Sequence, residues 1–193
     1  SSRVDLWVLE HTLRFLSAHR ERLPGQRFAI NLAPSTVCRV QFPLEVSRLL
    51  AKYAIEPWQL IFEVTECSTF CNAEQAQHIL RQLQKMGVRI AIDDFGTGYA
   101  SYARLKSVDA DILKIDGSFI RNIVNNSLDY QIVASICHLA RMKKMLVVAE
   151  YVESEEIRSA VHALGIDYVQ GYLIGRPAPL ESLLEAEAST ADA

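Results

Sequence analysis

Short apolar stretches rich in β-branched residues recur along the chain, and stretches with helical periodicity separate them. Such apolar runs are typical of buried strands, whereas amphipathic repeats at three- and four-residue steps are typical of helices that pack on a sheet. The pattern predicts a helix first, and then strands and helices in alternation. The predicted strands are Phe28 to Leu32, Leu60 to Val64, Val88 to Ile92, Ile112 to Ile115, Met145 to Ala149 and Tyr168 to Tyr172.

Several residues mark where the predicted helices begin and end. Gly87 and Gly165 follow amphipathic stretches and are expected to stop them, because glycine readily takes the backbone angles found just past a helix C-terminus. Pro43 and Pro179 stand where first helical turns would begin. Near the N-terminus, the spacing Ser2-x-x-Asp5 resembles a capping box, which predicts that these side chains close the first turn of a helix.

Continuously apolar strands joined by helices imply a parallel sheet, either open and doubly wound or closed into a barrel. Polar residues at the strand ends favour the barrel, because a barrel gathers such residues around one mouth. The absence of a glycine-rich phosphate loop after the first strand weakens the nucleotide-binding doubly wound alternative. The polar residues in question are Asn31, Glu63 with Glu66, Asp93 with Asp94, Lys114, Glu150 and Gln170. We therefore favour a barrel of the TIM type, (β/α)8, over the open sheet.

The predicted barrel is incomplete, since such a barrel needs eight strands and the pattern supplies six. We expect the first strands to lie N-terminal to Ser1, either cut away from the natural protein or outside the recorded sequence. The length of 193 residues fits one domain, which we assign to residues 1–184. Residues 185–193 lack a core pattern and are expected to form a frayed tail.

Composition narrows the classes of function. The net charge of −3, with no basic cluster interleaved with aromatics, argues against a nucleic-acid polymer as partner. No apolar run approaches the roughly 20 residues of a membrane helix, and the N-terminus lacks the layout of a signal peptide. Four irregularly spaced cysteines suit a reducing compartment, and five histidines fall in predicted helices. A cytoplasmic location is expected, although the parent protein could be membrane-anchored.

Carboxylates at separate strand ends form an oxygen-rich set that would repel itself without a cation. One such acid alone is as well explained by a solvated loop or a helix cap, but together they predict a site for divalent metal. Asp93 and Asp94 are adjacent, so both reach one site only if the chain bends there. Gly96 and Gly98 are predicted to permit that bend. A carboxylate that bridges two ions would suit hydrolysis of a phosphodiester.

Two further charged residues follow from the same pattern. Lys114 is a charge inside an apolar strand, so it requires a carboxylate or phosphate partner. It would lie well beside an attacking water or a phosphate oxygen. Asp116 is predicted to cap a helix from Ser118 to Val124 rather than to bind metal.

Motifs of a known family follow one another along the chain. They are Asn31-Leu32-Ala33, Glu63-Val64-Thr65-Glu66, Asp93-Asp94-Phe95-Gly96-Thr97-Gly98-Tyr99, Leu113-Lys114-Ile115-Asp116, Ala149-Glu150 with Glu153, and Gln170-Gly171-Tyr172 leading to Gly175-Arg176-Pro177. In their order and spacing, from Val4 to about Leu184, the chain resembles the EAL family of cyclic di-GMP phosphodiesterases. The resemblance implies a modified TIM-type (β/α)8 barrel that uses two magnesium or manganese ions to open cyclic di-GMP to linear pGpG. It also implies inhibition by calcium.

The resemblance also assigns roles to individual residues. Lys114 resembles the residue next to the attacking water, and Glu66 resembles the glutamate that steadies the loop from Phe95 to Ser101. Gln170 resembles a polar residue that lines the substrate site. Glu150 counts both as a catalytic residue and as a ligand. The residues that resemble metal ligands are Asn31, Glu63, Asp93, Asp94 and Glu150.

The chain departs from the family pattern in two places. The glutamate of the Glu-Ala-Leu segment belongs to an N-terminal part that this chain does not contain, so we hypothesise that this stretch alone hydrolyses poorly or not at all. Tyr151 stands where the family usually has glycine. Its ring would strain the loop if a positive φ is needed there, would bind substrate by stacking on a guanine, or would be a tolerated surface ring.

Three functions remain open on the sequence alone. A phosphodiesterase explains the retention of the metal-binding set, whereas a module that only senses cyclic di-GMP explains the absent segment and Tyr151. An unrelated metal-dependent barrel, such as an enolase-like enzyme, requires the motifs to be discounted. The resemblance further implies a homodimer, an N-terminal sensor or GGDEF domain, and a role in bacterial second-messenger signal transduction.

Overall fold

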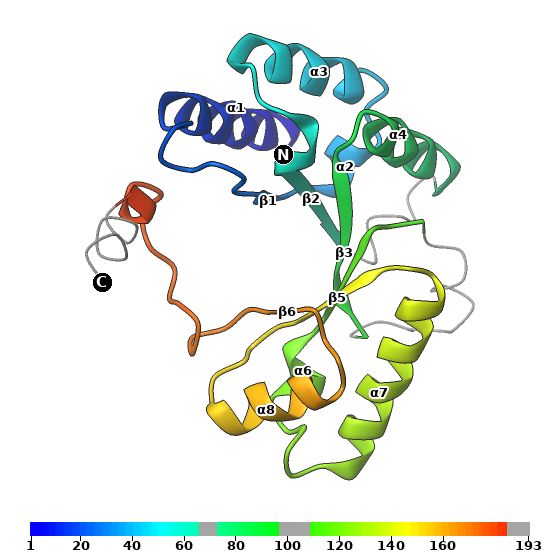
Figure 1. Cartoon of the computed structure of the whole chain (residues 1–193). Coiled ribbons are helices and arrows are strands. Elements are labelled where there is room, and N and C mark those ends of the chain that lie inside the picture. Colours follow the sequence, from blue (N-terminus) through cyan, green and yellow to red (C-terminus); the bar gives the residue numbers. More distant parts are fainter. Residues whose placement is uncertain (66–72, 97–108, 185–193) are drawn as a thin grey trace.

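Figure 1 presents a computed structural model of the chain, which describes residues 1–65, 73–96 and 109–184. The strands are β1 (Phe28–Asn31), β2 (Leu60–Thr65), β3 (Arg89–Phe95), β4 (Ile112–Ile115), β5 (Leu146–Ala149) and β6 (Tyr168–Val169). The α-helices are α1 (Ser2–Ala18), α2 (Pro34–Val37), α3 (Phe42–Tyr53), α4 (Ala73–Lys85), α6 (Gly117–Ile120), α7 (Ser127–Met142) and α8 (Glu155–Ala163), and η1 (Pro57–Gln59) is a 3-10 helix.

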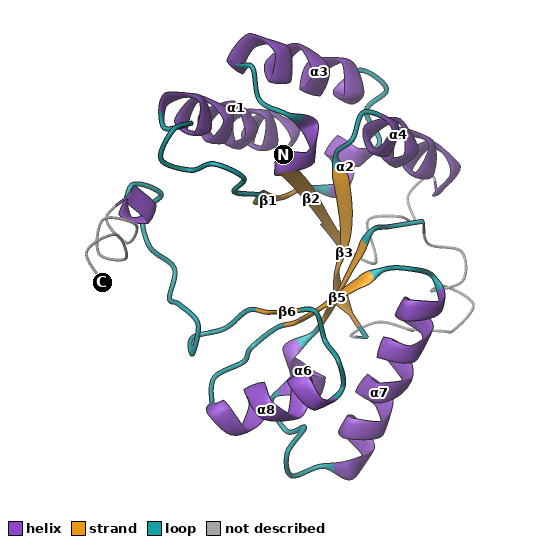
Figure 2. Ribbon diagram, viewed as in Figure 1, coloured by secondary structure: helices purple, strands orange, loops and turns teal. Residues whose placement is uncertain are grey.

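The strands form one parallel sheet in the order β1-β2-β3-β4-β5-β6, so each strand pairs with its neighbours in the sequence. The sheet is curled, and the helices cover its convex side (Figure 2). A doubly wound sheet would reverse its strand order and carry helices on both faces. The predicted α/β fold of the TIM-barrel type is therefore confirmed. Within the described residues β1 pairs only with β2 and β6 only with β5, so the barrel is open.

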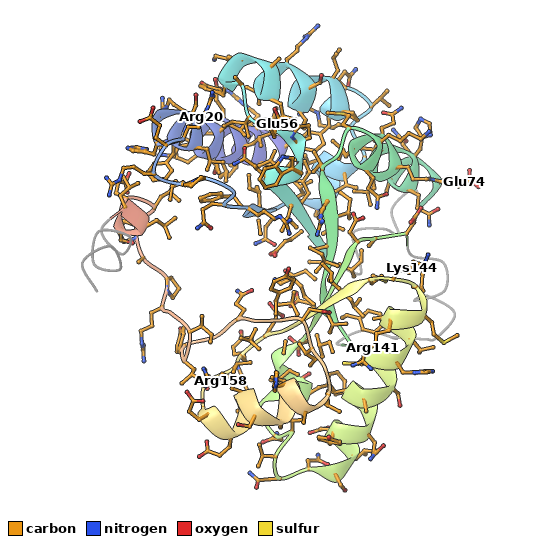
Figure 3. All side chains as sticks on the ribbon, in the orientation of Figure 1. Arg20, Glu56, Glu74, Arg141, Lys144 and Arg158 are labelled. Carbon is orange, nitrogen blue, oxygen red and sulfur yellow. The ribbon has the colours of Figure 1, made fainter. Side chains whose placement is uncertain are left out.

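The two faces of the sheet have different surroundings. On β2, Leu60, Phe62 and Val64 are fully buried under the helices, whereas Ile61 and Glu63 are half-buried and line the concave side. The helices return apolar side chains to the same core, and long side chains tie them together at the surface. For example, Arg20 donates hydrogen bonds to two carbonyls at the C-terminal end of α3 (Figure 3).

The predicted glycine stops are confirmed, since Gly87 follows α4 with φ +101° and Gly165 follows α8 with φ +69°. Asp116 caps α6 as expected, because its carboxylate accepts a hydrogen bond from Ser118 N at 2.8 Å. That helix is shorter than predicted and ends at Ile120. The last strand is also shorter, because the backbone turns at Gly171.

The predicted capping box at the N-terminus is wrong. Helix α1 begins at Ser2, and its first turn has no side-chain cap. Asp5 is instead buried, and its Oδ2 accepts hydrogen bonds from Ala33 N at 2.7 Å and Thr36 Oγ1 at 2.5 Å. The carboxylate satisfies donors at the start of α2. A buried donor left without a hydrogen bond costs more free energy than the exposed N–H groups of the first turn of α1, which water can reach.

No helix in residues 1–65, 73–96 and 109–184 has the length and apolarity needed to cross a bilayer. The predicted tail, residues 185–193, lies outside the described residues, and so do Glu66 and Gly98. The roles assigned to these residues stay predictions.

Candidate metal and active site

Lys114 lies at the centre of a group of carboxylates at the carboxyl ends of the strands. Its Nζ is 3.0 Å from Glu63 Oε2, 2.7 Å from Asp93 Oδ1 and 3.0 Å from Glu150 Oε1. These acids come from β2, from β3 and from the residue after β5, which parallel pairing brings to one edge. The prediction that Lys114 needs carboxylate partners is confirmed.

Burial and the attraction between opposite charges both shift the pKa values in this group, whose side chains are between 5% and 13% exposed. Burial raises the pKa of Glu63 and of Glu150, although the nearby Lys114 works in the opposite direction. Burial alone would lower the pKa of Lys114, but the attraction of the carboxylates, Glu63 foremost, outweighs it and raises the pKa above its usual value. Lys114 therefore stays positively charged and serves as the counter-ion of the cluster.

A bulge in β3 brings two adjacent aspartates to the same site. Pairing with β4 is regular up to Ile92, shifts, and resumes with Phe95 opposite Ile115. Within this bulge Asp94 has φ +54°, a left-handed conformation that non-glycine residues adopt at a cost of about 1–2 kcal/mol. The bend that the sequence predicts is present, but it begins at Asp94 itself. Gly96 contributes a second positive φ, +111°, further along.

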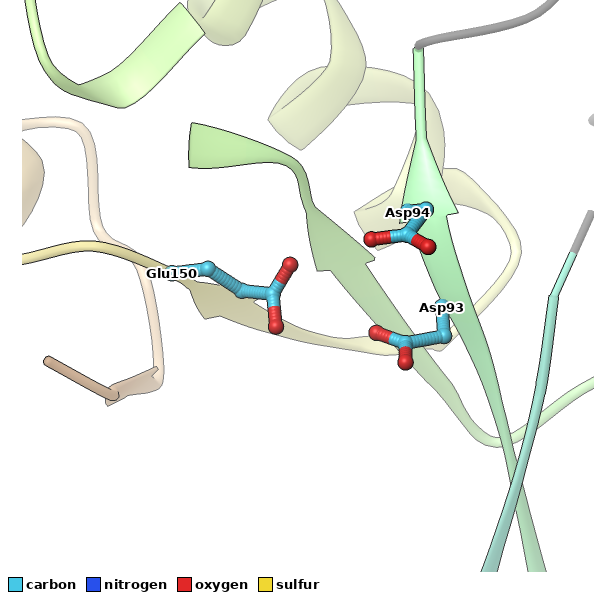
Figure 4. A group of neighbouring side chains, drawn as sticks. All are labelled: Asp93, Asp94 and Glu150. Carbon is cyan, nitrogen blue, oxygen red and sulfur yellow. The ribbon is translucent and has the colours of Figure 1, made fainter. Parts of the chain in front are cut away.

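The result is a cluster of oxygen donors that fits a divalent cation. One carboxylate oxygen from each of Asp93, Asp94 and Glu150 lies within 4.8 Å of the others (Figure 4). Asp93 Oδ1 is buried and receives no hydrogen bond of acceptable geometry, although Lys114 is close. A buried carboxylate oxygen without a hydrogen bond retains the capacity to bind a cation, and carboxylates are the ligands that hard divalent ions prefer.

Asn31 lies at the edge of this cluster. It ends β1 directly opposite Glu63 in the ladder, and Leu32 N donates a hydrogen bond to Glu63 O at 2.8 Å. Its side chain is exposed. The backbone thus fixes Asn31 next to a cluster member without a direct contact to Lys114.

Tyr151 has φ +54°, so the positive φ that glycine would favour at this position is present. Its ring is not a free surface ring, although the residue is 43% exposed. One side packs so closely on Gly117 that a Cβ there would lie 2.1 Å from Tyr151 Cδ2. The Arg121 guanidinium lies over the ring, 4.1 Å from its centroid. Gly117 and Arg121 are one helical turn apart, so Tyr151 lies across that turn.

A cleft of about 420 Å³ opens beside Glu150. Gln170, predicted to line the substrate site, lines this cleft together with Tyr151. Arg121 also lines it, and the sequence reasoning missed this residue. The sequence does place Arg121 four residues after Gly117, on the same face of a helix. That spacing points to the cleft only when the ring of Tyr151 is known to lie on this face.

Comparison with known proteins places this arrangement in context. The sequence matches the EAL domain family over residues 1–177. The cyclic di-GMP phosphodiesterase PdeF of Escherichia coli K12 is 71% identical over 188 residues, which cover 97% of this chain and 25% of that protein. The cyclic di-GMP phosphodiesterase PdeB of Shewanella oneidensis is 36% identical and covers 94% of this chain and 21% of its own length. The chain thus spans about a quarter or less of these relatives.

Solved structures have the same fold. The PaMucR phosphodiesterase in complex with c-di-GMP superposes with a TM-score of 0.85 and 37% identity, covering 94% of this chain and 74% of that chain. The EAL domain of Mycobacterium smegmatis DcpA superposes with a TM-score of 0.88 and 30% identity, and the match covers 95% of this chain and 83% of that chain. Both structures therefore contain residues beyond the matched part.

Proposed function

Because the chain belongs to the EAL domain family, we propose that it forms the larger part of a phosphodiesterase domain that hydrolyses cyclic di-GMP to pGpG. The observation that carries this proposal is the set of carboxylates around Lys114, to which the β3 bulge adds Asp94. A receptor that only binds the dinucleotide has no need of such a set. The sensing alternative is for that reason not favoured.

The proposed metal ligands are Asp93, Asp94 and Glu150, joined by Glu63 and Asn31 from the neighbouring strands. Their oxygen donors suit Mg²⁺ or Mn²⁺, and we propose two ions. Such ions, when bound, polarise a phosphate oxygen and make water a better nucleophile at neutral pH.

The chain's own residues supply binding and orientation. Lys114 is a fixed cation inside the cluster, so it would donate a hydrogen bond to a water or phosphate oxygen rather than take a proton. Glu63 and Glu150 hold Lys114 in place through the same contacts. Tyr151 and Gln170 line the cleft beside Glu150 and would bound the substrate there.

Formation of pGpG from cyclic di-GMP in Mn²⁺ tests the proposal. We expect little product from this chain alone, because the glutamate of the Glu-Ala-Leu segment is not part of it. Product should appear when the segment that precedes the matched region of PdeF is joined to Ser1. An extended chain that binds cyclic di-GMP with Ca²⁺ but never cleaves it with Mn²⁺ would favour the sensor. Full turnover by the short chain would refute the predicted need for that segment.

We further propose that the complete protein is a homodimer with an N-terminal sensor or GGDEF domain, acting in bacterial signal transduction. Support comes from the greater length of the relatives and from MucR of Pseudomonas aeruginosa, 39% identical, whose name describes a bifunctional diguanylate cyclase/cyclic di-GMP phosphodiesterase. Light scattering on the complete protein would test the dimer. The cytoplasmic location stays a prediction.

A further inference from the structure

Arg121 projects into the cleft beside Glu150 and has the surroundings of a recognition residue. Its guanidinium is stacked on the Tyr151 ring, 4.1 Å from the centroid, and it makes no ion pair with a side chain in the described part of the chain. A stacked guanidinium loses little freedom on binding, and its N–H donors remain available for a planar partner.

The walls of the cleft are held by backbone contacts. Val152 N donates to Gln170 O at 3.0 Å, and Leu173 N donates to Val152 O at 3.2 Å. Gly171 packs against the same backbone, where a Cβ would lie 2.2 Å from Val152 O. Both backbone groups of Val152 are therefore fixed, and this fixes the positions from which Tyr151 and Glu153 extend.

The charges that line the cleft are complementary to a particular base. Arg121 offers paired donors, and Glu153, which also lines the cleft, offers a carboxylate that no described cation occupies. Guanine presents two acceptors, O6 and N7, that match the fork of an arginine, and its N1–H and N2–H groups are donors that match a carboxylate. Adenine has a donor where guanine has O6, so it cannot accept the same arginine fork.

We propose that Arg121 is a specificity-determining residue that binds a guanine base of the substrate, with Tyr151 as the residue that positions it and Glu153 on the opposite edge of the base. This inference rests on the proposed function, because it names a base of cyclic di-GMP. It gives Tyr151 a role that differs from stacking on the base, since the ring already packs against Gly117 and carries the Arg121 guanidinium. The left-handed conformation of Tyr151 is then the cost of holding Arg121 in the cleft.

Calorimetric affinities for cyclic di-GMP and cyclic di-AMP in Ca²⁺ test the assignment, measured on this chain and on the chain extended with the preceding PdeF segment. Arg121→Ala should weaken binding of cyclic di-GMP by about 10- to 100-fold, the range for one bidentate contact to a base, and leave the weak binding of cyclic di-AMP almost unchanged. Arg121→Lys should behave like Arg121→Ala, because it keeps the charge and loses the fork. Arg48→Ala, an exposed arginine on α3, is the matched control and should change neither affinity.

Tyr151 variants separate positioning from general stability. Tyr151→Phe keeps the ring and should preserve the preference for guanine, whereas Tyr151→Gly should reduce that preference without loss of fold. A shift of melting temperature with unchanged preference would mean that Tyr151 is only structural and would overturn its positioning role.

The remaining outcomes are also decisive. If Arg121→Ala weakened the binding of cyclic di-GMP and cyclic di-AMP equally, Arg121 would contact a phosphate, and the guanine contact would be overturned. If the wild type binds cyclic di-GMP and Arg121→Ala binds it with the same affinity, the inference about Arg121 is overturned but the proposed function is not. A wild type that neither binds nor cleaves cyclic di-GMP, even when extended, would overturn the proposed function and this inference with it.

Discussion

Neighbouring residues of β2 illustrate how differently the two faces of the sheet are built. Phe62 points outward, is completely buried and packs against Phe42 with ring centroids 5.6 Å apart. Glu63 points inward and binds the Lys114 ammonium at 3.0 Å. The outer face gains stability from apolar contact, whereas the inner face gathers like charges that require a counter-ion. Alternate residues of β2 therefore have different roles: those that point outward stabilise the apolar core, and the inward-pointing Glu63 contributes to the charged cluster.

Removal of the counter-ion is the most severe change we predict. Lys114→Met would leave Glu63, Asp93 and Glu150 buried without a cation, and loss of one partner from a buried ionic group costs about 3–5 kcal/mol of unfolding free energy. Mn²⁺ should restore part of that loss, and turnover of the extended chain should be lost. Urea denaturation with and without Mn²⁺ measures the effect.

Lys52→Met is the matched control, because Lys52 pairs with Glu10 at the surface, where both side chains are about half exposed. It should change neither the unfolding midpoint nor its response to Mn²⁺ to any notable degree. A Lys114→Met protein as stable as wild type in EDTA would contradict the view of Lys114 as an obligatory counter-ion.

A change on the outer face of the same strand should also reduce stability, but Mn²⁺ should not restore the loss. Phe62→Ala creates a cavity in the apolar core and should cost about 3–5 kcal/mol of stability. Its response to Mn²⁺ should equal that of the wild type, because no ligand has been altered. If Mn²⁺ rescued Phe62→Ala as well as Lys114→Met, the separation of the two faces would fail.

Asp94→Asn probes the bulge, with a smaller effect on the fold. Partial desolvation of the exposed Asp94 carboxylate and the charge of Asp93 raise the pKa of Asp94, so removal of its negative charge relieves repulsion and should leave stability unchanged or slightly higher. Affinity for Mn²⁺ should fall at least about 10- to 100-fold, the loss typical of weaker disturbances around a metal site. Titration calorimetry would measure it, and unchanged affinity would exclude Asp94 as a ligand.

The smallest effect is expected at Ala54, which shares a left-handed backbone with Asp94 but ends α3 on the outer side. Its φ is +51°, at the position where the carbonyl accepts a hydrogen bond from Arg20. Ala54→Gly should relieve the strain and raise stability by about 0.5–1 kcal/mol, after subtraction of the entropy of glycine. Thermal denaturation would detect the gain, and Mn²⁺ affinity should not change. A loss of stability would show that Ala54 is not strained.

The sequence predicts the fold well where one local rule decides. Every predicted strand is present within two or three residues of its bounds, because a continuous apolar run has few alternatives between two helices. The glycine stops and the Asp116 cap are likewise decided by neighbours in the chain. Lys114 could be predicted to need a partner because an unpaired charge in an apolar strand is too costly.

Features that depend on distant partners could not be predicted. Asp5 has the spacing of a capping box, but the nearby start of α2 offers it buried donors, and no local pattern reveals this. The positive φ of Asp94 is also hidden, because the bulge follows from the pairing of β3 with β4 rather than from a glycine. The same holds for Arg121, whose place is fixed only by the ring of Tyr151.

The lysine within the carboxylate cluster has a consequence for how the protein comes into being. Small zinc domains have no native state until the metal arrives, because their ligands have nothing else to hold them together. Here an ammonium group synthesised with the chain already draws Glu63, Asp93 and Glu150 into place. Folding therefore does not have to wait for a metal ion, and any ion that binds would meet Glu63, Asp93 and Glu150 already held by Lys114.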